Sequence, residues 1–207
     1  MPLAVLALGA FGLGGVRLGA NPVAAITDTL GLWALRLLVA TLALTPLRYL
    51  TGSSDWLRYR RMLGLFAFFY LSLHLAMYVV VDRRFDWRTL GEDLAKRPWI
   101  TLGFLAFVLL VPLALTSTQA AMRRLGRRWQ RLHYLVYPAA VLGCWHFYWQ
   151  VKRDVREPLA YAAALALLLG VRAVRRGWRA RRAPRAYIDV RADQSSGKNR
   201  SSSAFAR

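Results

Sequence analysis

The 207-residue chain contains three histidines, His74, His133 and His146, and each lies within or at the edge of a strongly apolar run. An imidazole inside a membrane is costly unless its ring has a partner, so such a histidine indicates a functional site. Helix bundles commonly hold haem between histidines on facing helices. These residues therefore predict haem iron bound by imidazoles. For any single histidine, packing with a hydrogen bond to a neighbouring carbonyl is the alternative.

Six apolar runs can supply the helices that position these histidines, since a spanning helix needs about 20 residues. They cover Pro2–Val16, Leu30–Leu47, Leu63–Val81, Trp99–Thr116, Leu132–Val151 and Leu159–Val171. We expect an all-α integral membrane six-helix bundle over residues 1–171. A basic, Ser-rich, disordered cytoplasmic tail is expected at 172–207. The first run lacks the basic segment that opens a signal peptide, so we expect it to be a retained helix.

The depth of each histidine favours one pairing. His74 lies about 18 Å along the third helix from residue 62, whereas His146 lies about 24 Å and His133 about 5 Å along the fifth helix from residue 130. The third and fifth helices run in the same direction, so haem is expected between them, with His74 opposite His146. His133 and His146 are about 140° apart on a straight helix, and Pro138 between them can kink or unwind the helix and alter that angle. The two histidines can therefore belong to two haem sites, or one can be a ligand while the other has no role in haem binding.

The charge distribution predicts the orientation. The net charge is +20, from 30 basic and 10 acidic residues. The connection Arg48–Arg61 carries +3 and Ser117–Arg131 carries five arginines without an acid, whereas Asp82–Arg97 balances five bases against four acids. This alternation follows the positive-inside rule with both termini in the cytoplasm. The excess of basic residues therefore reflects the orientation of the chain in the membrane, and we do not expect nucleic acid as a partner. Arg36, inside the second run, must face a haem propionate, the bundle interior or the interface.

Several motifs resemble the MsrQ (YedZ) family of haem-binding subunits. They are Asn21-Pro22-Val23, Thr45-Pro46-Leu47, Arg60–Leu65, Leu73-His74-Leu75, Arg97-Pro98, Leu115–Gln119, Leu125-Gly126, Trp129, Leu132-His133 and His146–Trp149. The resemblance runs from about Asn21 to Val171. That family is similar to the transmembrane domain of ferric reductases and NADPH oxidases, six-helix haem b proteins that move electrons across a membrane.

The resemblance implies the function and the cofactors. It implies electron delivery across the bacterial inner membrane to MsrP, a periplasmic molybdopterin enzyme that reduces methionine sulfoxide in oxidised proteins. It carries over His74, His133 and His146 as ligands of one haem b or two, and it implies FMN in some members. The larger reductases have paired histidines on both haem-binding helices, whereas the positions thirteen and fourteen before His74 are Arg61 and Arg60.

The segment at the end of the fourth run offers contacts for a flavin or a donor. Ser117 and its neighbours Thr116 and Thr118 can contact flavin or cap a helix end. Arg124, within the basic loop Met122–Arg128, can bind a flavin phosphate or dock a soluble donor, or can serve only to orient the chain.

The sequence also limits the chemistry. Haem iron held by two imidazoles has no open position for substrate, so we expect electron transfer with no substrate chemistry of its own. The absence of a dinucleotide fingerprint predicts that electrons come from a cytoplasmic flavin reductase or from quinol. The alternatives are a stand-alone ferric or metal reductase and a non-redox transporter or scaffold subunit. No acidic residue lies in the three central runs, which disfavours a proton-coupled transporter.

Overall fold

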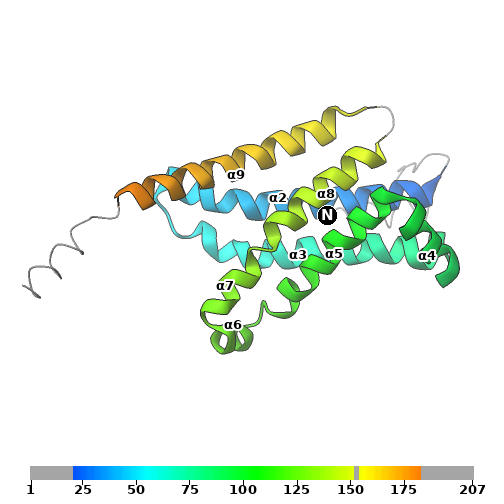
Figure 1. Ribbon diagram of the computed structural model, residues 1–207, viewed down its shortest axis with the longest axis horizontal. Coiled ribbons are helices and arrows are strands. Elements are labelled where there is room, and N and C mark those ends of the chain that lie inside the picture. Colours follow the sequence, from blue (N-terminus) through cyan, green and yellow to red (C-terminus); the bar gives the residue numbers. More distant parts are fainter. Residues whose placement is uncertain (1–20, 152–153, 183–207) are drawn as a thin grey trace, which may run out of the picture. The chain divides into compact units, whose positions relative to one another are not determined.

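The computed structural model describes residues 21–151 and 154–182, and every regular element in these ranges is a helix. Figure 1 shows α2 (Pro22–Thr51), α3 (Trp56–Ala76) with its π-helical extension (Met77–Asp82), α4 (Trp87–Lys96), α5 (Pro98–Leu115), α6 (Gln119–Leu125), α7 (Arg127–His133), α8 (Val136–Gln150) and α9 (Arg156–Arg182). The expected first span, Pro2–Val16, lies outside the described residues.

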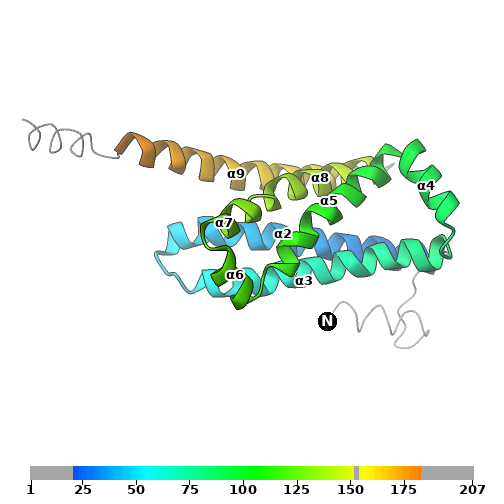
Figure 2. The same cartoon turned by 60° about the horizontal axis from the view of Figure 1, so that its bottom comes forward.

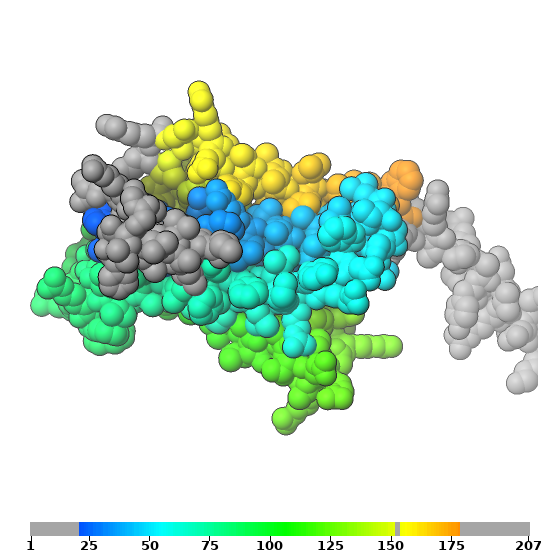
Figure 3. Space-filling view, turned by 180° about the vertical axis from the view of Figure 1, so that it is seen from behind, coloured from blue at the N-terminus to red at the C-terminus, as the bar shows by residue number. Residues whose placement is uncertain are grey.

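Two antiparallel helix pairs form the main packing units. Helix α2 packs along α3, and α5 packs against α8. Figure 3 shows the blue surface of α2 next to the cyan and blue-green surface of α3. Helix α4 connects α3 to α5 at one end of these helices, while α6 and α7 lie at the opposite end (Figures 1 and 2). We name these the α4 end and the α6–α7 end.

Four of the described helices are long and apolar enough to cross a membrane: Pro22–Thr51, Trp56–Asp82, Pro98–Leu115 and Arg156–Trp178. Only 11% of the apolar window in the second of these is buried by other parts of the chain. Large apolar side chains such as Phe66, Phe69 and Val108 face outward, at 48%, 47% and 44% exposure. Apolar surface of this extent requires a non-aqueous environment, so the protein is a membrane protein.

Local sequence sets the helix ends. The Asn21 side chain accepts a hydrogen bond from the Ala24 backbone N–H at 3.1 Å, and Pro22 follows at the first helical position. Helix α2 ends at Thr51 and is capped by Gly52, which has a φ of 73° and donates its N–H to the Arg48 carbonyl. Glycine adopts this left-handed conformation without a steric penalty. Asn21 and Gly52 therefore set the start and the end of α2, the first helix of the α2–α3 pair.

The fifth apolar run, Leu132–Val151, is divided between two helices. We expected that Pro138 could kink or unwind this run, and the structure shows it unwound: α7 ends at His133 and α8 begins at Val136. Pro138 has no N–H to donate to the Tyr134 carbonyl, and its ring would clash with that carbonyl in a continuous helix. Instead the Tyr134 carbonyl accepts from the Tyr137 N–H at 3.1 Å. His133 and His146 consequently lie on separate helices.

The chain divides into two units between Leu168 and Leu169, and α9 begins in the first and ends in the second. The helix continues past residue 171, where we expected the span to end, to Arg182. Residues 183–207 lie outside the described residues, so the expectation of a disordered tail there stays a prediction.

Candidate metal centre between two helical pairs

His74 of α3 and His146 of α8 lie opposite each other near the α4 end. Their ring centroids are 6.2 Å apart and their ring planes are inclined by 75°. The depth argument predicted this proximity, because helical rise alone places the two residues at similar heights on parallel helices. Their role as ligands stays a prediction.

Each of these two rings is fixed by a hydrogen bond to a backbone carbonyl on the helix that packs against its own. His74 Nδ1 lies 2.8 Å from the Thr27 carbonyl oxygen of α2, and His146 Nδ1 lies 2.7 Å from the Trp99 carbonyl oxygen of α5. A carbonyl oxygen can only accept, so Nδ1 carries the proton in both rings. The lone pair therefore resides on Nε2, the nitrogen that would bind a metal.

A glycine lies against each ring. A Cβ atom added to Gly31 would lie 2.9 Å from His74 Nδ1 and 3.0 Å from Cε1, and one added to Gly103 would meet the same two atoms of His146 at the same distances. The nearest ring atoms are thus Nδ1, Cε1 and Cγ, so Nε2 is directed away from both glycines. The glycines leave room for the imidazoles where any other side chain would collide with them.

The separation of the two rings suits one metal bound between them. Because a metal–imidazole bond is about 2.0 Å long, one metal would fit between two imidazoles at this separation. Within the described ranges, no cluster of three or more His, Cys, Asp or Glu residues could hold a metal ion. Haem iron, which brings four nitrogen ligands of its own, fits the two imidazoles.

His133 occupies a different site, at the α6–α7 end. Its Nδ1 lies 3.1 Å from the Trp129 carbonyl oxygen of its own helix, and its ring stacks on the Trp129 indole with centroids 3.8 Å apart. Trp129 in turn donates from Nε1 to the Thr116 carbonyl at 2.9 Å. The structure therefore separates His133 from the facing pair of histidines and anchors it to the end of α5.

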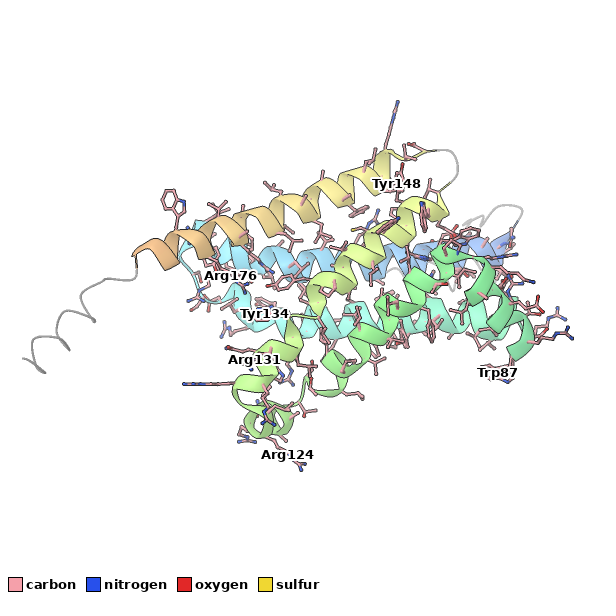
Figure 4. The ribbon with its side chains drawn as sticks, in the orientation of Figure 1. Trp87, Arg124, Arg131, Tyr134, Tyr148 and Arg176 are labelled. Atoms are coloured by element: carbon pink, nitrogen blue, oxygen red, sulfur yellow. The ribbon has the colours of Figure 1, made fainter. Side chains whose placement is uncertain are left out.

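The other predicted site residues make contacts with other groups or are exposed. Arg36 donates from Nε to the Tyr161 hydroxyl at 2.8 Å and lies over the Trp33 ring. The Ser117 hydroxyl donates to the Leu113 carbonyl at 2.6 Å, as expected for a residue that satisfies a helix end. Arg124 is exposed on α6 at the α6–α7 end (Figure 4). Their predicted cofactor contacts stay predictions.

An ion cluster at the α4 end surrounds the buried carboxylate of Asp93. Its Oδ2 accepts from the Tyr78 hydroxyl at 2.6 Å and pairs with Arg83 at 2.7 Å, while its Oδ1 pairs with Arg97 at 3.1 Å. The hydrogen bond to the Tyr78 hydroxyl, together with the neighbouring carboxylates, raises the pKa of Arg83. The cluster joins α4 to the end of α3 and to the start of α5.

Helix α4 is also capped at its start, and it presents aromatic side chains to the surroundings. Asp86 accepts from the Thr89 hydroxyl at 2.6 Å and from the backbone N–H groups of Thr89 and Arg88, and these hydrogen bonds lower the pKa of Asp86. Trp87 is 71% exposed and Phe85 is 53% exposed. Figure 4 shows Trp87 on α4, at the opposite end of the helices from Arg124.

Sequence reasoning missed four residues that position the two histidines: Thr27, Trp99, Gly31 and Gly103. Thr27 and Trp99 act through backbone carbonyls, which every residue type possesses, so their identity gives no signal. The glycines could have been found from the sequence, because the triplet Thr-Leu-Gly occurs at 29–31 and again at 101–103.

The fold is that of a polytopic helical membrane protein in which histidines of two different helices face each other, and comparison with known families agrees with the membrane fold. The family described as "Ferric reductase like transmembrane component" matches residues 30–144. This range contains His74 and His133 and ends two residues before His146.

The similarity to individual proteins is closer still. The chain is 58% identical over 163 residues to the protein-methionine-sulfoxide reductase heme-binding subunit MsrQ of Xanthomonas campestris pv. campestris (strain 8004), which covers 79% of this chain and 75% of the relative. It is 55% identical over 161 residues to the protein of the same name from Rhodospirillum rubrum, covering 77% of each. The chain belongs to the MsrQ family.

Proposed function

We propose that the protein is a membrane electron-transfer subunit in which His74 and His146 hold haem b. The observation that carries this proposal is the facing pair of imidazoles, 6.2 Å apart, with both Nδ1 atoms bonded to backbone carbonyls. That arrangement leaves both Nε2 lone pairs for a metal, and second-shell carbonyls of this kind are typical of metal-binding histidines. The relatives' name, heme-binding subunit, supports the same cofactor.

The chemistry expected of such a site is electron transfer alone. Haem iron bound by two imidazoles has no open position for substrate, so the bound group exchanges single electrons. The protein's own residues hold the two imidazoles in one tautomer through the carbonyls of Thr27 and Trp99. Bond-making is left to the partner enzyme, and we propose that this partner is the periplasmic molybdopterin-dependent methionine sulfoxide reductase MsrP.

The charge pattern supports an inner-membrane orientation with the α6–α7 end in the cytoplasm. The five arginines Arg123, Arg124, Arg127, Arg128 and Arg131 lie at that end, and the segment that holds them has no acidic residue. By the positive-inside rule, α4 then faces the periplasm. We propose that a cytoplasmic flavin reductase or quinol supplies electrons near the α6–α7 end, and that MsrP docks at the α4 end, close to the facing histidines.

His133 supports a second cofactor position at the cytoplasmic end. Its Nδ1 is bonded to a carbonyl, as in His74 and His146, so its Nε2 also has a free lone pair. We propose that His133 contributes to a second haem or borders an FMN near Ser117 and Arg124. His133 would hold this group nearer to the cytoplasmic donor than the facing histidines are.

Absorption spectra of the purified membrane protein test the haem proposal. Wild type should show a reducible, low-spin haem b spectrum. His74→Ala and His146→Ala should each remove most of that haem, whereas His133→Ala should retain more of it. Folded but colourless wild-type protein from haem-replete cells would refute the proposal, and equal loss in all three variants would contradict the assignment of His74 and His146 as the pair.

Stopped-flow oxidation of the reduced protein tests the acceptor. Dithionite-reduced protein should be reoxidised rapidly by MsrP with protein-bound methionine sulfoxide, and His74→Ala should abolish this reaction. Reoxidation by ferric chelates alone would instead favour a metal reductase.

Labelling of single cysteines tests the orientation, in a Cys144→Ser background. A cysteine at position 88 should react with an impermeant reagent in intact spheroplasts, whereas one at position 124 should react only after lysis. The reverse pattern would overturn the orientation and the proposed direction of electron flow.

A further inference from the structure

The surroundings of His74 and His146 repeat at one fixed interval. Three pairs of residues are each separated by 72 positions: the two histidines, the glycines that lie against them (Gly31 and Gly103), and the residues whose carbonyls accept from them (Thr27 and Trp99). The two Nδ1-to-carbonyl distances are 2.8 and 2.7 Å, and an added Cβ on either glycine would lie 2.9 Å from the nearest Nδ1. Two separate helical pairs thus provide the same local geometry.

The sequence repeats at the same interval. Seven residues of α2 recur in α5 at a spacing of 72: Thr29, Leu30, Gly31, Ala34, Leu37, Leu38 and Val39 correspond to Thr101, Leu102, Gly103, Ala106, Leu109, Leu110 and Val111. Burial follows the repeat. Ala34 and Ala106 are both 5% exposed, and on the partner helices Ala67 and Ala139 are 2% and 1% exposed. The α2–α3 and α5–α8 pairs are therefore two copies of one structural unit.

We propose that Gly31 and Gly103 are equivalent positioning residues, each holding one haem-ligand imidazole through the carbonyl one helical turn before it. In an α-helix, the N–H of Gly31 points to the Thr27 carbonyl and the N–H of Gly103 to the Trp99 carbonyl. A side chain at the glycine would cover that carbonyl and collide with the ring. Glycine leaves the second lone pair of the oxygen open, so the same carbonyl can also accept from the histidine.

This inference rests on the proposed function, since the positioned rings are the proposed haem ligands. The two repeated units fix their imidazoles in the same tautomer, so the two nitrogens that would bind a metal would be chemically matched. Both are Nδ1–H tautomers bonded to a carbonyl, which makes each imidazole a stronger electron donor to the metal. Loss of either hydrogen bond should weaken donation to ferric iron and raise the midpoint potential.

The experiment compares Gly31→Ala and Gly103→Ala with two control substitutions. Gly64→Ala and Gly143→Ala lie on α3 and α8, the helices that hold the histidines, but their added Cβ atoms would meet nothing closer than 3.8 and 3.9 Å. Haem content, the electron paramagnetic resonance spectrum of ferric protein and the midpoint potential are measured for all four. The first two variants should lose haem, or show altered low-spin signals with a raised potential, and the controls should match wild type.

A double-mutant cycle covers variants that fold poorly or hold no haem. Gly31→Ala should lower the Tm of the haem-free protein when His74 is present, but not in a His74→Ala background, where the imidazole no longer meets the added methyl group. The same cycle applies to Gly103 and His146.

The outcomes separate this inference from the proposed function. Wild-type protein without haem refutes the proposed function. The double-mutant cycle then tests only whether each glycine leaves room for its histidine ring. Wild type with haem, together with Gly31→Ala and Gly103→Ala variants that match the controls in spectrum, potential and Tm, refutes the positioning role and leaves haem binding standing.

Discussion

Removal of the Asp93 carboxylate should release α4 from the ends of α3 and α5. Asp93 is 6% exposed and pairs with Arg83 at 2.7 Å and Arg97 at 3.1 Å. Breaking a buried ion pair by removing one partner costs about 3–5 kcal/mol. The side chains of Arg83 and Arg97 are 21% and 46% exposed, so water can partly replace the lost carboxylate. For Asp93→Asn we therefore expect a cost of about 2–3 kcal/mol in local stability.

Hydrogen exchange of the α4 amides measures this effect directly. Since each 1.4 kcal/mol is a factor of ten, exchange in α4 should become about 30- to 150-fold faster. Asp82→Asn is the matched control, because Asp82 also pairs with Arg83 but at 3.4 Å and with a side chain 52% exposed. Surface pairs of this kind contribute about 0–1 kcal/mol. Equal protection of α4 in the two variants would show that the cluster around Asp93 does not anchor the helix.

Three further substitutions test other parts of the fold. The hydrogen bonds from Thr89 and Arg88 lower the pKa of Asp86. The stabilisation of α4 by the Asp86 carboxylate should therefore be complete above the unfolded pKa of about 3.9, and it should be lost as the pH falls through the lower folded pKa. Hydrogen exchange of α4, corrected for the intrinsic rate, should show this loss in wild type but not in Asp86→Asn. Pro138→Ala restores a backbone N–H, so the amide at position 138 should become protected by the Tyr134 carbonyl as α7 and α8 join; rapid exchange there would mean that the break has another cause. Tyr161→Phe removes the hydroxyl that accepts from Arg36 Nε. Hydrogen bonds to charged groups contribute about 1.5–3 kcal/mol, so Tyr161→Phe should lower the Tm more than the control Tyr148→Phe, which changes an exposed side chain.

The sequence by itself determined the membrane class and the height of each histidine. Apolar runs near the length of a bilayer require helices, because lipid cannot satisfy backbone hydrogen bonds. The rise per residue in a helix is fixed, so the distances of His74 and His146 from their helix starts were enough to predict that they lie at similar heights on parallel helices. Positions along a helix follow from counting residues, which is why this part of the site could be predicted.

Tertiary structure decided the contacts around each residue. The sequence left open how Pro138 would act, and the structure shows a complete break before it rather than a kink in one span. Arg36 was assigned to a propionate, the interior or the interface, and only the packing of the first unit brings the Tyr161 hydroxyl within 2.8 Å of it. The carbonyls of Thr27 and Trp99 became acceptors for the histidines because helix pairing aligned them with Nδ1. Rotation about a helix axis and the choice of neighbour depend on how side chains interlock between helices, and a sequence read one helix at a time does not contain that relation.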